Sequence, residues 1–251
     1  SVAISDLPNT AENLLLQCAL SHLGATIATP PKDDGSLAKL MEAHNVRGVI
    51  CVDGAAPPCQ VQSHRALPTV HLEALGRPAG GSVPFDELVV HCPPRGAPPA
   101  AHGGTLLGIY GGAALTQAAA LSLGAAAAER LELSESDRVC CSVTLMHAFG
   151  IASSICSALT AGGAVVLPAV GGIKGCGNPA QRAEVTLAVL AATEASVLFG
   201  DTHTLRAMAA ETTATLPALR TGVIKIGSGN DFLDGVTEAP GGKDRAPLPL
   251  A

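Results

Sequence analysis

One histidine lies where a parallel sheet presents ligand-binding side chains. The apolar, β-prone run 139–143 predicts a strand, and His147 follows it directly, with Gly150 close behind. A small-residue helix at 151–160 and a strand at 164–167 would complete a β-loop-α-β unit. Open α/β sheets bind ligands at the carboxyl ends of their strands. His147 therefore either lines a pocket or bonds to nearby backbone at the strand end.

A glycine pair offers the second candidate for binding chemistry. The segment 111–116 (GGAALT) follows a strand expected at 105–110 and precedes an Ala-rich helix expected at 117–131. A glycine turn before a helix can hold a phosphate group. Thr116 is the only hydroxyl residue of this turn, however, and residues 40–173 contain no lysine. We therefore expect a tight strand-to-helix connection that does not bind ATP.

The cysteines do not form a recognisable reactive or metal-binding set. They stand at positions 18, 51, 59, 92, 140, 141, 156 and 176. No C-x-x-C pair occurs, and the His91-Cys92 pair has no partner at zinc-site spacing. We expect buried, free thiols in a reducing compartment. A Cys140 or Cys141 nucleophile acting with His147 is disfavoured, because both thiols lie inside the expected strand.

Three further patterns have simpler structural explanations. Asp231 and Asp234 lie in a Gly-rich stretch and are more typical of a solvated turn than of a metal site. The glycine-rich segment 171–177 lacks the G-x-G-x-x-G order, and Asn178 with Pro179 predicts an N-cap and the first residue of a helix. No G-x-S-x-G nucleophile elbow is present. We therefore expect no metal site.

Composition excludes some classes of function. Hydrophobic residues make up 47% of the 251 residues, but aromatics only 2%, so the core must be built from Ala, Val, Leu and Ile. The net charge of −6 and the scarcity of aromatic side chains argue against nucleic-acid binding, which needs basic patches and stacking platforms. No apolar run is long enough to span a bilayer.

The amino-terminal part predicts alternating strands and helices. Asn9 is a plausible N-cap for a helix that ends at Gly24. The polar segment 33–36 precedes a second helix at 37–44, and the nearly continuous apolar run 46–52 is typical of a strand buried on both faces. With a strand near the first residues, this is a β-α-β-α-β series with right-handed crossovers.

Changes in amino-acid composition and hydrophobic pattern along the chain suggest four segments. We expect a first βαβ portion at 1–53, a Pro-rich connector with one or two short strands at 54–104, an α/β core at 105–231 and an irregular tail at 232–251.

The order of these elements resembles that of a known family. The sequence S-x-x-D-R-V, a strand, MHAFG, a helix and GGAVVLP resembles the adenylate-forming acyl-CoA synthetase (AMP-binding) superfamily. Further stretches resemble it at 2–24, 27–31, 185–208 and 219–229 (LRTGVIKIGSG). The resemblance implies an α/β fold of layered, mostly parallel sheets with helices on both faces, like the N-terminal domain of these ligases.

The same resemblance implies a damaged site. His147 and Gly150 would line a remnant acyl pocket, with Gly227, Ser228 and Gly229 facing them. The family's phosphate loop, rich in Ser, Thr and Gly and ending in Pro-Lys-Gly, is replaced here by a short turn. Its Mg²⁺-binding Thr-Glu motif, its ribose-binding Asp and its lid domain would lie beyond residue 251. We therefore expect no bound cofactor and no catalytic residue.

These features favour a non-catalytic domain that serves as an accessory or structural subunit of a larger assembly. Its Ala-rich core predicts a small margin of stability without partners. The alternative is an ATP-dependent acyl-CoA ligase whose missing parts are supplied elsewhere. The absence of Met at position 1 fits either a cleaved targeting peptide or a leader that is disordered or was cut away. A cleaved leader, reduced thiols and the family's many mitochondrial members suggest a mitochondrial respiratory-chain or ATP-synthase complex, with a cytoplasmic location as the alternative.

Overall fold

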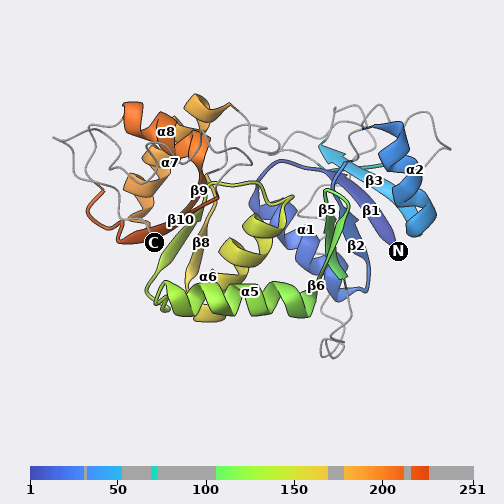
Figure 1. Cartoon of the computed structure of the whole chain (residues 1–251), viewed down its shortest axis with the longest axis horizontal. Helices are drawn as coiled ribbons and strands as arrows, with labels where there is room; N and C mark the ends of the chain where they lie inside the picture. The colour runs from blue at the N-terminus through green and yellow to red at the C-terminus, as the bar shows by residue number, and fades with distance from the viewer. Residues whose placement is uncertain (31–32, 53–68, 73–105, 169–177, 212–215, 226–251) are drawn as a thin grey trace. The chain divides into compact units, whose positions relative to one another are not determined.

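The computed structural model describes residues 1–30, 33–52, 69–72, 106–168, 178–211 and 216–225 (Figure 1). The chain divides into two compact units, Ser1–Ala118 and Ala119–Ala251. None of the described helices is long and apolar enough to cross a membrane.

The first unit contains a six-stranded sheet with the order β4-β3-β1-β2-β5-β6. Its strands are β1 (Val2–Asp6), β2 (Thr26–Ala28), β3 (Val46–Val52), β4 (Thr69–Leu72), β5 (Leu106–Tyr110) and β6 (Ala113–Thr116). All neighbouring strands run parallel except β5 and β6. The predicted β-α-β-α-β series is confirmed, and strands β5 and β6 of the segment expected at 105–231 pair with this amino-terminal sheet.

Two helices cover opposite faces of this sheet. The faces can be told apart because consecutive strand residues point to opposite sides. On one face, Ile4 and Val49 pack with Leu37 of α2 (Asp34–Ala43). On the other face, Ile50 packs with leucines of α1 (Ala11–His22). Helices on both faces are what the fold class predicted.

The capping residues of these helices differ partly from the prediction. Asn9 does not cap α1; Thr10 does, because its hydroxyl accepts a hydrogen bond from the Asn13 N–H. Asp33 caps α2 by accepting the Ser36 N–H at 2.7 Å, so this helix begins three residues earlier than the predicted 37–44.

The glycine pair after β5 is a hairpin turn, and the prediction of a direct strand-to-helix connection was wrong. Tyr110 pairs with Ala113 in antiparallel register, leaving Gly111 and Gly112 as a two-residue loop. Their φ angles of 58° and 85° are both positive, as in a type I′ turn. The helix α5 (Gln117–Arg130) starts only after the second strand of this hairpin.

The second unit has a four-stranded parallel sheet with the order β10-β9-β7-β8. Its strands are β7 (Arg138–Cys141), β8 (Ala164–Val166), β9 (Val197–Asp201) and β10 (Thr221–Lys225). The strands predicted at 139–143 and 164–167 are therefore confirmed, and they are direct neighbours in this sheet.

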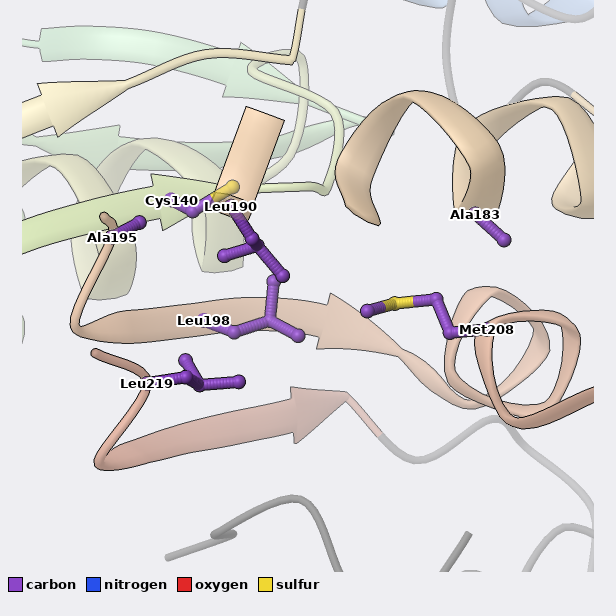
Figure 2. Close-up of a cluster of buried hydrophobic side chains, with 7 residues drawn as sticks. All are labelled: Cys140, Ala183, Leu190, Ala195, Leu198, Met208 and Leu219. Carbon is purple, nitrogen blue, oxygen red and sulfur yellow. The ribbon is translucent and has the colours of Figure 1, made fainter. Parts of the chain in front are cut away.

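Side chains alternate between the two faces of the sheet along β7 and β9, so each face has its own hydrophobic core. Cys140 and Leu198 face α7 (Pro179–Thr193) and α8 (Thr202–Glu211), and Figure 2 shows Leu190 of α7 pointing toward Leu198. Val139 and Phe199 lie in the other core, with residues of α5 and α6 (Cys156–Ala161). Helices therefore pack on both sides of this sheet, as the predicted fold class implies. Asn178 caps α7 with Pro179 at its first turn, as predicted.

The helix predicted at 151–160 has a different geometry. Phe149–Ile155 is a π-helix, and only Cys156–Ala161 is α-helical. Its start presses on the preceding loop, since a Cβ added to Gly150 would lie 2.2 Å from the Thr144 carbonyl oxygen. π-Helical turns are rare and recur at functional sites.

Candidate functional site

The candidate site lies at the carboxyl end of β7, where the chain turns toward the π-helix. The strand continues its pairing through the Ser142 N–H, which donates to the Phe199 carbonyl at 2.8 Å. The Ser142 carbonyl accepts from Arg182 at 3.1 Å, and its hydroxyl lies 2.6 Å from that of Thr186. Both partners are buried residues of α7, so the start of this loop is held rigidly.

His147 is held by its own backbone, as one of the two interpretations predicted. Its Nδ1 accepts a hydrogen bond from the Phe149 N–H at 3.0 Å. Its Nε2 lies 3.0 Å from Nζ of Lys225, the last residue of β10. Burial, and then the positive charge of Lys225, lower the pKa of His147 below its usual value. The imidazole is therefore neutral at pH 7.

The two contacts of His147 cannot both be good hydrogen bonds. A neutral imidazole has one donor nitrogen and one acceptor nitrogen. If Nδ1 accepts from Phe149, then Nε2 carries the proton and meets the Lys225 ammonium, which has only donors. The contact between Lys225 and His147 therefore places two donors against each other.

Gly150 is required by the close approach of two backbone segments. It is buried, and any side chain there would collide with the Thr144 carbonyl. Its role is to let the π-helix start directly beside the loop that carries His147. Of the five predicted pocket residues, the structure brings together these two. Gly227, Ser228 and Gly229 lie outside the described residues.

Sequence reasoning missed two charged residues at this edge. Asp201 ends β9 and is the register partner of Lys225 on β10. Its Oδ1 accepts the Thr204 N–H at 2.8 Å and so caps α8. Among the described residues, Oδ2 of Asp201 has no hydrogen-bond partner although it is buried, and the same is true of the Thr202 hydroxyl. The available signal was that both strands end on a charged residue.

Lys225 and Asp201 lie on the same face of the sheet as the π-helix. A Cβ at Gly200 would lie 3.3 Å from Ile224, so these two residues share the opposite face. The residues that follow them, Asp201 and Lys225, therefore point to the side where Phe149 stacks on Phe199 at 5.7 Å. One polar cluster thus occupies the carboxyl end of this face: His147, Lys225 and Asp201.

Among the cysteines that the structure describes, none gives a nucleophile at this site; the side chains of Cys51, Cys59, Cys92 and Cys176 lie outside the described residues. Cys140 and Cys141 are buried, and burial raises the pKa of both thiols, so neither forms a thiolate at neutral pH. Cys156 is also buried, as expected, whereas Cys18 is exposed. The predicted turn residues Asp231 and Asp234, and the glycine-rich segment 171–177, lie outside the described residues.

The position that the resemblance assigns to a phosphate loop lies in the other unit and is closed. The Gly111 N–H donates to the Thr29 hydroxyl at 2.9 Å, so one of the turn's few donors is already used. Strand pairing resumes at Ala113. No loop separates the two strands that could wrap around a chain of phosphates.

The fold described by these two sheets is that of adenylate-forming acyl-CoA and aryl-CoA ligases in their N-terminal region. The anthranilate CoA ligase AuaEII in complex with anthranoyl-AMP superimposes with a TM-score of 0.68 at 17% identity, covering 89% of this chain and 44% of that one. O-succinylbenzoate coenzyme A synthetase (MenE) from Bacillus subtilis, in complex with AMP, gives 0.66 at 15% identity, covering 93% and 46%.

A putative long-chain-fatty-acid CoA ligase from Rhodopseudomonas palustris gives a TM-score of 0.64 at 19% identity, covering 93% of this chain and 58% of that one. The chain thus spans about half the length of the structures it resembles. Neither a family model nor a curated protein matches the sequence. The likeness is therefore one of fold, and it confirms the predicted fold class.

Proposed function

We propose that this chain is a non-catalytic domain with the acyl-CoA synthetase fold and acts as an accessory or structural subunit of a larger assembly. The observation that carries the proposal is the Gly111-Gly112 hairpin. A phosphate loop holds ATP through several backbone N–H groups, hydroxyls and a lysine. Here two residues connect β5 to β6, and one of their N–H groups already binds Thr29.

The energetic consequence is large. Hydrogen bonds to a charged group contribute about 1.5–3 kcal/mol each. Losing the lysine and two or three hydroxyl or N–H donors would therefore remove several kcal/mol of the affinity for a triphosphate, and every 1.4 kcal/mol is tenfold in affinity. A micromolar site would become a millimolar one or weaker.

Isothermal titration of the purified chain with Mg·ATP tests the proposal. We expect no saturable heat up to millimolar nucleotide, and the same flat trace with Mg·ADP. The matched control is Thr29→Ala, which frees the Gly111 N–H without changing the loop length and should not create a site. A saturable Mg·ATP site of micromolar affinity would refute the proposal.

The surface of α5 supports a role in an assembly. Surface helices normally carry charged and polar residues on their outer side. From Gln117 to Ala128 this helix has no charged residue, and Leu121 and Leu123 are 54% and 48% exposed. A partner protein that covers this side would remove the exposed leucines from water.

The size of the native protein tests whether it belongs to an assembly. The endogenous protein, extracted in mild detergent and separated on a native gel, should migrate in a complex far larger than 25.0 kDa. We further propose that this complex is a mitochondrial respiratory-chain or ATP-synthase complex, and fractionation of organelles with marker subunits checks that location. Migration as a free monomer in the cytosol would exclude both.

A second candidate function is an acid-thiol ligase completed by parts from another chain. The observation that favours it is the position of His147 and Gly150 after the carboxyl end of β7, the usual place for a ligand in this kind of sheet. Hydroxylamine trapping of acyl-adenylates by the intact native assembly distinguishes the two functions. The non-catalytic proposal predicts no acid-dependent hydroxamate above that of an assembly lacking this chain.

A further inference from the structure

Lys225 contacts His147, an unfavourable partner, and lies beside Asp201, whose Oδ2 has no hydrogen-bond partner among the described residues. Its ammonium group lies 3.0 Å from Nε2 of His147, whose Nδ1 already accepts the Phe149 N–H. As shown above, this sets a donor against a donor. Such a contact gives Lys225 little stabilisation and leaves the side chain free to choose another acceptor.

That acceptor is present on the neighbouring strand. Asp201 is the register partner of Lys225, and both residues lie at the carboxyl end of the same sheet face. Adjacent strands are about 4.8 Å apart, well within the reach of a lysine side chain. Oδ2 of Asp201 is buried, and the described part of the chain offers it no hydrogen bond. A buried carboxylate oxygen without a donor is costly.

The groups around His147 leave few other possibilities for Lys225. The segment that carries His147, from His147 through the π-helix to the end of α6 at Ala161, contains no acidic residue. The neighbouring strand ends bring Lys225 itself and Asp201, and α8 adds His203 and Arg206 in its first turns. Among these described elements, Asp201 is the acidic group within reach.

We infer that Lys225 is a two-position gate at the carboxyl edge of the second sheet. In the position seen here it covers Nε2 of His147. In the other position its ammonium pairs with Oδ2 of Asp201, and the outward nitrogen of His147 becomes accessible from the strand ends. The two positions differ only in lysine rotamers, so the exchange needs no movement of the sheet.

Chemical modification of His147 measures the gate directly. Diethyl pyrocarbonate acylates accessible, neutral imidazole nitrogens, and mass spectrometry reports the rate at each histidine of the full chain. Lys225→Met removes the cover, so His147 should react about fivefold faster than in the unmodified protein. Asp201→Asn removes the second partner and should hold Lys225 on His147, so that the rate falls about fivefold.

The variants are chosen so that a folding defect does not imitate the result. Asn caps helices as well as Asp does, so Asp201→Asn keeps the bond to Thr204. The exposed Lys39→Met is the matched control for loss of a lysine, and the rate at His22 on α1 is the internal reference. The rate at His147 should be unchanged in Lys39→Met, and the rate at His22 should be the same in every variant.

The double variant decides between the gate and a direct effect of the Asp201 charge. In the Lys225→Met background, Asp201→Asn should leave the rate at His147 unchanged, because there is no lysine to redirect. Equal effects of Asp201→Asn with and without Lys225, or no effect in either background, would overturn the inference.

Discussion

At the scale of single residues, the second unit depends on one carboxylate. Asp137 precedes β7 and is 5% exposed. Nε and Nη2 of Arg220 donate to its two oxygens at 3.0 and 2.9 Å, and the Ser196 hydroxyl and Ser134 N–H donate as well. The same arginine reaches the Leu131 carbonyl at 3.0 Å. This network joins the turn before β7, the start of β9 and the start of β10.

Asp137→Asn should therefore destabilise the second unit by about 2–3 kcal/mol. This is less than for a fully buried ion pair, because the Arg220 side chain is 40% exposed and water screens its charge. Urea denaturation followed by circular dichroism measures it. The control is Glu194→Gln in the exposed pair with Arg138, which should change stability by less than about 0.5 kcal/mol. Equal effects of the two substitutions would contradict the account.

The pH dependence of this effect has a definite sign. The Arg220 hydrogen bonds, with those from Ser196 and Ser134, hold the pKa of Asp137 well below its usual range in the folded protein. Its stabilising contribution is therefore complete above the unfolded pKa near 3.9 and is lost as the pH falls toward the folded value. The stability difference between wild type and Asp137→Asn should shrink by about 1 kcal/mol between pH 7 and pH 3. A constant difference over that interval would exclude this explanation.

At the scale of elements, α5 packs on α6 through its smallest residues. Ala120, Gly124 and Ala128 form its buried stripe. A Cβ added to Gly124 would lie 2.5 Å from the Cys156 Cβ and 2.6 Å from its backbone carbonyl carbon. The two helices therefore approach as closely as a glycine permits.

Gly124→Ala should destabilise the protein by about 1–3 kcal/mol even though alanine is the better helix former. Thermal melting monitored at 222 nm measures the change. Ser122→Ala, two residues away and exposed, is the control and should be neutral or slightly stabilising. A higher melting temperature for Gly124→Ala would show that the helices are not in this contact.

Elements were predictable from the sequence where one local signal decides. The buried strands β3, β7 and β9 appear as apolar runs, and Asn178-Pro179 marks the start of α7. The hairpin of β5 and β6 was missed, although a glycine pair between two β-prone runs is a hairpin signal. The π-helix was missed because its geometry depends on contacts with the loop before it.

The site was predictable only in part for the same reason. A strand end places His147 at the carboxyl edge whatever the rest of the chain does. Lys225 and Asp201 join it only because β10, β9 and β7 are neighbours, and strand order is a property of the whole sheet. Sequence spacing alone does not contain that order.

At the scale of the whole molecule, each of the two units has its own core. Large aromatic side chains are scarce in both: the buried aromatic residues of the described chain are Phe199 and Tyr110. Burial of apolar surface stabilises the folded state by about 25 cal/mol per Å². Because alanine buries less apolar area than leucine or phenylalanine, an alanine-rich core contributes less free energy per residue. The margin of stability should therefore be small.

The isolated chain should accordingly melt below about 60 °C, within the lower part of the usual range for mesophilic domains. Differential scanning calorimetry measures it, and the endogenous assembly provides the comparison, since binding to partners raises the apparent stability of the folded state. A single cooperative transition well above 60 °C for the isolated chain would contradict a fold that depends on partners.

We propose that this chain does not activate carboxylic acids, and ATP–pyrophosphate exchange tests that proposal most directly. Exchange requires that a single protein bind Mg·ATP and an acid and form the acyl-adenylate reversibly. With labelled pyrophosphate and a panel of aliphatic and aromatic acids, the purified chain should show no acid-dependent exchange above buffer, because the Gly111-Gly112 hairpin leaves no loop to hold the phosphates. Acid-dependent exchange that saturates with ATP and is abolished by His147→Ala would contradict it.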